Sequence, residues 1–331
     1  MSSIWGNKLK VSVFGESHGS AIGVTIDGFP PGFQVDFNAV EAELKRRAPG
    51  QNETSTARRE ADEFETISGL FNGLTTGAPL TAICRNTDTR SRDYKPDIPR
   101  PSHADLAAIE KYGGFSDYRG GGHFSGRLTA PIVFTGAIAK QILRSKYGIE
   151  IISRIVEIRG ETDPERQRET ILTAKSNGDS VGGIIECVVN NPPKSLGEPM
   201  FDGVESVISS ILFSIPAVKG VEFGDGFEFA KKFGSEVSDG LYYDSGEVKY
   251  FANHNGGING GITNGEPIIF RVALKPTPTI STPQSTVDLS SGENVTYSFH
   301  GRHDPCVVPR AVPVAECAAA IAILDLILGG K

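Results

Sequence analysis

The sequence is poor in cysteine and carries no excess of positive charge. Its four cysteines include no C-x-x-C pair, a spacing typical neither of a disulfide framework nor of a zinc site: Cys84, Cys187, Cys306 and Cys317. The formal net charge of -7 argues against nucleic-acid binding, because contacts with phosphate usually require a clear basic excess. Any anion that this protein binds must therefore be met by local groups of cations.

Long hydrophobic runs are missing as well. The N-terminal segment MSSIWGNKLK lacks the apolar region of a signal peptide. The longest apolar run, Cys317–Leu324, is far shorter than the roughly 20 residues of a membrane helix. These features predict a cytoplasmic protein that binds no membrane. Hydrophobic residues still make up 38% of the chain, which is enough for a sizeable core.

Glycine, in contrast, is abundant, with 39 of 331 residues against an average usage of roughly 7%. The glycines gather in runs such as RGGGHFSGR (119–127) and GGINGGITNG (256–265), without a collagen-like period. Because glycine lets the backbone approach a ligand closely, these runs indicate binding loops.

Hydrophobic periodicity predicts a mixed α/β chain. The pattern after Val35 predicts a helix with Asn38 as its N-cap that ends before Pro49. Further helices are expected at 103–113, 129–148, 199–215 and 310–330, and strands at 10–14, 21–28, 150–160, 181–191 and 265–276. No linker or internal repeat divides the sequence, so residues 1–331 are expected to form a single domain. Long polar loops at 47–62, 85–103, 117–127 and 275–305 are the expected places for binding chemistry.

The motif GESHG, residues 15–19, formally matches the G-x-S-x-G nucleophile elbow of serine hydrolases. An elbow needs a helix directly after its second glycine, whereas the following segment SAIGVTIDG is strand-like. The pattern therefore favours a tight polar turn that carries Ser17 and His18, and for a lone histidine a structural role is the alternative.

Arginines concentrate in the Gly/Pro-rich loops of this acidic protein, where their planar forks suit carboxylates and phosphates. Ten of them lie in these loops: Arg46, Arg47, Arg58, Arg59, Arg90, Arg92, Arg100, Arg119, Arg127 and Arg302. Any single one is explained by an ion pair with neighbouring acids, as in RREADE, but together they indicate a polyanionic ligand. RGGGHFSGR is either a backbone nest for phosphate or a plain tight loop, and it is not a Walker A motif.

The motif HGRHDP, residues 300–305, places two histidines and an arginine beside Asp304. No further ligand lies at zinc-like spacing, so no metal site is expected. The aspartate is better interpreted as an acid–base or orienting group, with a solvated turn as the alternative.

Taken in order, these motifs resemble the chorismate synthase family. The matching blocks run from residue 15 to 316 and are GESHG, RRAPG, TARREAD, SGLFNGLTTGAPL, NTDTRSRDY, RPSHAD, KYGGFSDYRGGG, GDSVGG, SIPAVKGVEFGDGF, GGINGGITNG, ALKPTPTI and GRHDPCVVPRAVPVAE. An ordered series across nearly the whole chain is far more specific than any one motif.

The resemblance implies a lyase that converts 5-enolpyruvylshikimate 3-phosphate to chorismate by 1,4-anti elimination of phosphate, with reduced FMN and no net redox change. It also implies a sandwich, an α/β (α+β) fold with helices between two antiparallel sheets, and a homotetramer. NADPH would be needed only where the protein itself reduces the flavin, and the absence of a reductase domain favours an external supply.

The resemblance also assigns roles to residues. His18, His103 and Asp304 match catalytic positions, the histidines protonating reduced flavin and departing phosphate. Substrate positions are Ser17, Arg47, Arg58 and Arg127. The FMN positions are His123, Phe124, Ser125, Ala217, Gly260, Lys275, Pro276, Thr277, Pro278, Thr279 and Arg302.

The sequence departs from the family pattern at a few positions. It reads GGGHFSGR where many members read GGGRSSAR, RPSHAD for RPGHAD, and has Glu53 where many carry arginine. Two rival functions remain. A conventional FMN oxidoreductase should show a recognisable dinucleotide site, and a non-catalytic anion-binding protein would leave His18, His103 and Asp304 without a reason to lie in ligand loops.

Overall fold

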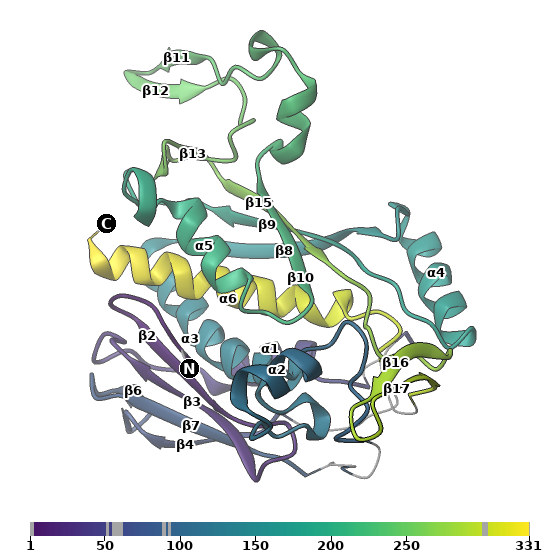
Figure 1. Ribbon diagram of the computed structural model, residues 1–331. Helices are drawn as coiled ribbons and strands as arrows, with labels where there is room; N and C mark the ends of the chain where they lie inside the picture. Colours follow the sequence, from purple (N-terminus) through teal and green to yellow (C-terminus); the bar gives the residue numbers. More distant parts are fainter. Residues whose placement is uncertain are drawn as a thin grey trace.

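Two antiparallel sheets enclose a layer of helices (Figure 1). The computed structural model describes residues 3–50, 53–54, 62–87, 91, 94–299 and 304–330. The predicted sandwich of helices between two sheets is confirmed, and with it the mixed α/β class.

The first sheet has the strand order β1 (Ile4–Trp5), β2 (Lys10–Gly15), β3 (Ala21–Asp27), β7 (Leu80–Arg85) and β4 (Phe64–Ser68). Buried residues alternate along β7, as expected for a sheet that covers a core with one face. The strands predicted at 10–14 and 21–28 are confirmed as β2 and β3, which pair from Lys10↔Asp27 to Gly15↔Ile22. The two short strands β5 (Leu70–Phe71) and β6 (Leu74–Thr75) form a hairpin beside this sheet.

The second sheet has the order β10 (Val218–Phe223), β15 (Ile268–Leu274), β9 (Gly183–Asn190) and β8 (Glu150–Ile158). Every second residue of β15 is buried, and Phe270 in its middle pairs with Cys187 of β9. The strand ends before Pro276, as predicted, because proline has no N–H to donate to a neighbouring strand. The predicted strands at 150–160 and 181–191 are likewise present.

The helical layer consists of α1 (Phe37–Arg47), α3 (Thr129–Tyr147), α5 (Val204–Leu212) and α6 (Val308–Gly329). The α1 helix ends before Pro49 as predicted, but its cap is Asp36 and not Asn38. The Asp36 carboxylate accepts hydrogen bonds from the N–H groups of Asn38 and Ala39 at 2.9 and 3.3 Å. Since the helix already begins at Phe37, Asn38 lies inside the first turn.

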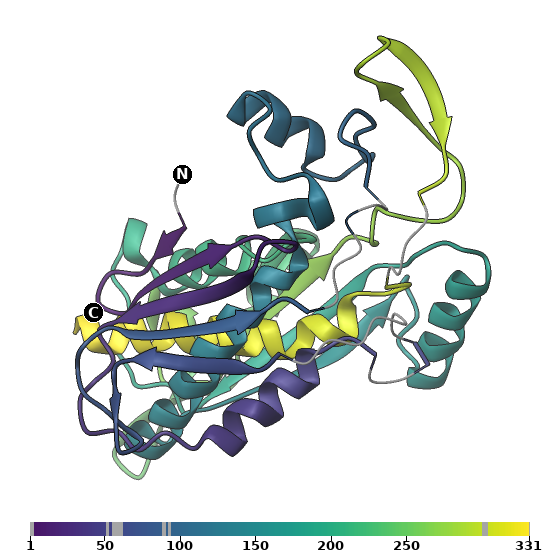
Figure 2. The ribbon, with the colours of Figure 1, turned by 90° about the horizontal axis from the view of Figure 1, so that it is seen from below.

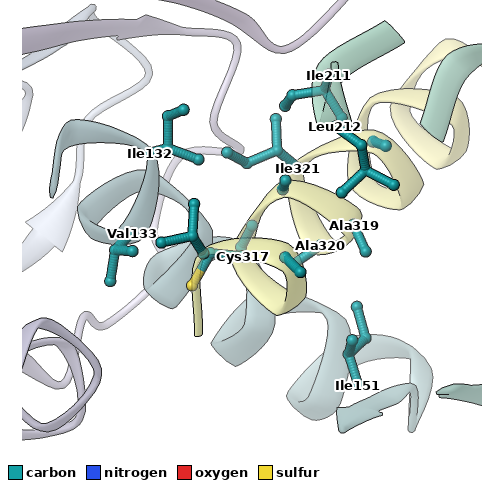
Figure 3. Close-up of a cluster of buried hydrophobic side chains, with 14 of the residues drawn as sticks. Ile132, Val133, Ile151, Ile211, Leu212, Cys317, Ala319, Ala320 and Ile321 are labelled. Carbon is teal, nitrogen blue, oxygen red and sulfur yellow. The ribbon is translucent and has the colours of Figure 1, made fainter. Parts of the chain in front are cut away.

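The C-terminal helix α6 is the centre of the core. It is long and apolar enough to cross a membrane, but 83% of its most apolar window is buried inside the protein, as in the core helix of a soluble protein. Side chains of α3, α5 and β8 close around it, as Figure 3 shows for Val133, Leu212 and Ile151. The predicted long, alanine-rich buried helix is thereby confirmed, and its alanines allow the neighbouring helices to approach closely.

The helices α3 and α6 approach each other closely at Gly136. A Cβ atom added there would lie 2.2 Å from Cβ of Cys317 and 2.5 Å from its carbonyl oxygen. We expect Gly136→Ala to lower the free energy of unfolding by about 1–3 kcal/mol, the usual cost of overpacking a core. Urea unfolding measures this, with Gly234→Ala as control, because nothing lies within 4 Å of the added methyl group there. Equal stabilities of the two variants would contradict the close packing.

The remaining elements lie outside this sandwich. They are α2 (Asp105–Tyr112), α4 (Pro164–Ser176) and the hairpins β11–β12 (Leu241–Asp244, Glu247–Tyr250), β13–β14 (Ile258–Asn259, Ile262–Thr263) and β16–β17 (Gln284–Asp288, Glu293–Tyr297). The last hairpin falls within 275–305, which was expected to be loop. Seen from below, α2 and the β16–β17 hairpin project on the same side of the sheets (Figure 2), and the chain between and around them carries most of the predicted site.

Candidate active site

The GESHG turn lies against the glycine-rich loop. The N–H of Ser17 donates to the carbonyl of Gly122 at 3.0 Å, and Nδ1 of His123 donates to the carbonyl of Gly15 at 2.8 Å. A Cβ atom on Gly120 would lie 2.5 Å from Cδ2 of His18, so only glycine allows this loop to touch the imidazole. The residues after GESHG form strand β3, which excludes the nucleophile elbow and supports the tight polar turn.

The glycine-rich loop is a tight turn built on three successive glycines. Gly120, Gly121 and Gly122 have φ of +62°, +82° and +53°, a left-handed run that glycine alone adopts readily. Arg100 approaches the loop, with Nη2 3.5 Å from the position of a Cβ on Gly121. Its guanidinium is held by Asp105 through two hydrogen bonds of 2.8 Å. Burial raises the pKa of Asp105, but the hydrogen bonds and charge of Arg100 lower it more, so the net shift is downward and the pair stays ionised.

His103 lies beside the KPTPT segment that follows β15. Its Nε2 contacts the hydroxyl of Thr279, and Nζ of Lys275 donates to the carbonyl of Ser102 at 2.6 Å. The N–H of Lys275 donates to the carbonyl of Ala217 at 2.9 Å, and Ala217 has a positive φ of +76°. The motifs RPSHAD, KPTPT and SIPAVKG therefore meet at one place, although they are far apart in the sequence.

A buried ion cluster joins the predicted substrate arginines. The Asp62 carboxylate lies between Arg47, whose Nη1 is 2.9 Å from Oδ2, and Arg127, which contacts Oδ1. All three side chains are buried: that of Arg47 is 3% exposed, that of Asp62 1% and that of Arg127 2%. They come from the end of α1, the residue pair before β4, and the turn before α3, so the cluster depends on the complete fold.

The cluster extends to the GESHG turn through Asn86. Nε of Arg127 donates to Oδ1 of Asn86 at 3.2 Å, and Nδ2 of Asn86 donates to the carbonyls of Glu16 and Gly19, both at 2.9 Å. One amide side chain thus fixes both ends of the turn that carries His18.

In the other direction the cluster reaches Asp304. Nε of Arg310, in the first turn of α6, donates to the carbonyl of Arg47 at 3.0 Å, and its Nη1 pairs with the Asp304 carboxylate. The predicted catalytic aspartate is therefore connected through Arg310 to the arginines predicted to bind substrate.

The structure brings most of the predicted site residues into this region. The Ser125 hydroxyl accepts from the N–H of Arg127 at 3.3 Å, and Phe124 lines a cavity of about 40 Å³ together with Tyr94, Arg100, Thr279 and Tyr297.

Gly260 is the exception. It lies in the turn between β13 and β14, at the end of the second sheet opposite to Lys275 (Figure 1). Strand β15, with seven residues, spans the roughly 20 Å between the two ends. Arg58 and Arg302 lie outside the described residues, so their predicted roles stay predictions.

Sequence reasoning missed three residues of the site: Asp62, Asn86 and Arg310. All three belong to motif blocks, TARREAD, NTDTRSRDY and GRHDPCVVPRAVPVAE, but their partners lie in other blocks. The structure also gives Glu53 a local role, since its carboxylate accepts from Nε of Arg168 on α4 at 2.7 Å. This contact ties Glu53 to α4.

Comparison with known proteins identifies the family of this chain. The family model of chorismate synthase matches residues 9–328. The chain is 49% identical over 326 residues to the chorismate synthase of Chitinophaga pinensis, covering 98% of this chain and 96% of the relative. It is 46% identical over 351 residues to that of Korarchaeum cryptofilum, covering 98% and 97%.

A solved structure described as a crystal structure of chorismate synthase superimposes with a TM-score of 0.75 at 28% identity, covering 98% of this chain and 93% of the other. Sequence and fold therefore agree over nearly the full length of both partners in each comparison. This chain belongs to the chorismate synthase family.

Proposed function

We propose that the protein converts 5-enolpyruvylshikimate 3-phosphate to chorismate by 1,4-anti elimination of phosphate, using reduced FMN. The observation that carries this proposal is the meeting of His18, His103 and Asp304 with glycine-rich and arginine-containing segments drawn from the whole length of a chain of this family. A non-catalytic anion-binding protein would have no use for these three residues in that arrangement.

The residues around KPTPT fit a flavin phosphate. The hydroxyl oxygen of Thr277 is buried and has no hydrogen-bond partner among the described residues. Lys275 supplies a cation at the start of the same segment, and its Nζ lies 2.6 Å from a loop carbonyl that a phosphate oxygen could replace. Lys275, Thr277 and Thr279 would hold reduced FMN, with the backbone of Pro276, Pro278, Ala217 and the His123–Ser125 segment beside it. The chemistry supplied by bound reduced FMN is transient donation of electron density to the substrate as phosphate leaves.

The two histidines are assigned by their neighbours. His103 contacts Thr279 of the proposed flavin segment, so we assign to His103 the protonation of the reduced flavin. His18 lies beside Ser17, a predicted substrate residue, and its Nδ1 is 3.0 Å from the hydroxyl of Ser91. Because His18 lies in the turn that carries Ser17, we assign it the protonation of the departing phosphate.

Asp304 is proposed to accept the C6 proton, directly or through a relay. Its ion pair with Arg310 orients the carboxylate, as an orienting group does for other catalytic bases. Ser17, Arg47, Arg127 and Arg58 would bind the phosphate and carboxylates of the substrate, since guanidinium groups match these anions in a bidentate geometry.

We further propose a homotetramer in the cytoplasm that uses an external supply of reduced flavin. Support for self-association comes from residues 224–257, which project from the second sheet (Figure 1) and expose large aromatic side chains. Phe227, Phe233, Tyr243 and Phe251 are 74–79% exposed, and a two-stranded hairpin such as β11–β12 gains stability when another surface covers it.

The deciding experiment is anaerobic incubation of the purified protein with 5-enolpyruvylshikimate 3-phosphate and chemically reduced FMN. We expect chorismate and phosphate to appear in equal amounts, with the flavin still reduced at the end, because the elimination has no net redox change. Phosphate without chorismate, or no product from folded protein, would contradict the proposed reaction. Omission of flavin serves as the control and should abolish both products.

A further inference from the structure

Asp62 connects the two halves of the site. Among the described residues, its carboxylate contacts the guanidinium groups of both Arg47 and Arg127, one through each oxygen. All three side chains are at least 97% buried. Asp62 itself is not expected to touch substrate, because its two oxygens already face the two arginines.

The position of the carboxylate determines the position of both cations. Arginine carries its charge at the end of a flexible chain, and a carboxylate that accepts from it fixes the plane of the guanidinium. Without a negative charge between them, two buried guanidinium groups would repel each other, since Coulomb forces are weakly screened in the protein interior. Asp62 therefore sets the separation of Arg47 and Arg127 through its two ion pairs, and the hydrogen bond from Nη1 of Arg127 also sets the orientation of that guanidinium.

Each arginine is also tied to a different catalytic element. Arg127 donates to Asn86, which holds the GESHG turn with His18. The carbonyl of Arg47 accepts from Arg310, which pairs with Asp304. A displacement at Asp62 would thus be transmitted to the histidine on one side and to the aspartate on the other.

We propose that Asp62 is a positioning residue that holds Arg47 and Arg127 at the separation required by a substrate with several negative charges. This inference rests on the proposed function, in which that substrate is 5-enolpyruvylshikimate 3-phosphate. The proposal gives an acidic residue a role in binding an anion, although a negative charge by itself would repel the substrate.

The test compares Asp62→Asn and Asp62→Glu with the wild type in KM, kcat and substrate affinity measured by calorimetry without flavin. Asn keeps the shape and removes the charge, whereas Glu keeps the charge and adds a methylene that pushes the guanidinium groups apart. We expect both variants to raise KM and the dissociation constant by about 10- to 100-fold, because a displacement of about 1 Å in a positioned group has effects of that size. A purely structural counter-ion predicts normal KM for Asp62→Glu.

Asp325→Asn is the matched control. Asp325 is also buried and accepts hydrogen bonds from the N–H groups of Asn7, Lys8 and Leu9, but it lies 15 residues beyond Arg310 on α6, or about 22 Å along the helix. The Asp325→Asn variant should have a lower Tm than the wild type, and its KM should stay within twofold of the wild-type value.

The outcomes separate the two proposals. If the wild type neither binds the substrate nor forms chorismate, the proposed function fails and this inference falls with it. If the wild type is active and Asp62→Glu has unchanged KM, only the role of Asp62 is wrong. A lower KM in Asp62→Asn would also overturn it, because Asp62 would then compete with the substrate. Should Asp62→Asn not fold, Asp62→Glu alone decides.

Discussion

Replacing His103 by alanine is expected to lower kcat for chorismate formation by about 10²- to 10⁴-fold, the range typical for loss of a general acid–base group. The imidazole lies at the junction of the RPSHAD and KPTPT segments, in contact with Thr279. Because it acts on a proton and makes no proposed contact with substrate, KM should change much less than kcat. Anaerobic stopped-flow measurement of chorismate with reduced FMN gives both constants.

Two further variants make this result specific. Thr279→Val keeps the ring and removes the hydroxyl that contacts it, so its loss in kcat should be smaller than that of His103→Ala. His254→Ala changes a histidine that is paired with Asp225 at 2.8 Å, away from the site, and should keep wild-type kcat if the protein elutes in the same assembly. Equal kcat for wild type and His103→Ala would mean that His103 is structural.

Local elements were predictable because their signals are local. The stop of β15 before Pro276, the end of α1 before Pro49 and the buried C-terminal helix follow from proline chemistry and hydrophobic periodicity over short windows. The sandwich itself was predicted only from the family resemblance. Which face of a strand meets which helix depends on contacts such as that between Gly136 and Cys317, 181 residues apart, and short windows do not contain such contacts.

The candidate site shows the same limit. The arginines were recognisable as anion-binding residues, with neighbouring acids in RREADE as the alternative explanation. In the structure, two of the arginines interpreted as anion-binding residues do form ion pairs with an acid. That acid is Asp62, the last residue of TARREAD, and its partners Arg47 and Arg127 belong to two other motifs. A sequence shows that charges of both signs are present, but the pairing of Asp62 with Arg127 across 65 residues is decided only when the chain folds.

A second buried carboxylate, Glu316, joins the helices to the second sheet. Its side chain on α6 is 4% exposed and accepts from Arg46 of α1 at 2.8 and 2.9 Å, from Lys140 of α3 at 2.7 Å and from the N–H of Ser153 of β8 at 3.1 Å. Burial raises the pKa of Glu316, but the hydrogen bond from Arg46 and the charge of Lys140 lower it more, so the pKa lies below its ordinary value of 4.5.

We expect Glu316→Gln to lower the free energy of unfolding by roughly 1–3 kcal/mol near pH 7, because it removes the charge of a buried acceptor in this network, while Arg46 and Lys140 keep Glu43 as a counter-charge. The wild type gains this stability from an ionised carboxylate whose pKa is lower when folded than when unfolded. The gain is therefore complete above about pH 4.5 and is lost as the pH falls through the folded pKa. Denaturant unfolding at a series of pH values should show the difference between wild type and variant shrinking below pH 4.5.

The exposed ion pair of Arg144 and Glu150 provides the control. Nε of Arg144 lies 3.3 Å from Oε1 of Glu150, and the two side chains are 77% and 52% exposed. Surface pairs of this kind contribute about 0–1 kcal/mol, so Glu150→Gln should be close to wild type at every pH. A difference between wild type and Glu316→Gln that stayed constant from pH 7 to pH 3 would contradict a contribution from the ionised carboxylate. A shrinking difference would show that its charge holds α1, α3 and β8 against the central helix, and with them the helix ends that carry Arg47 and Arg310.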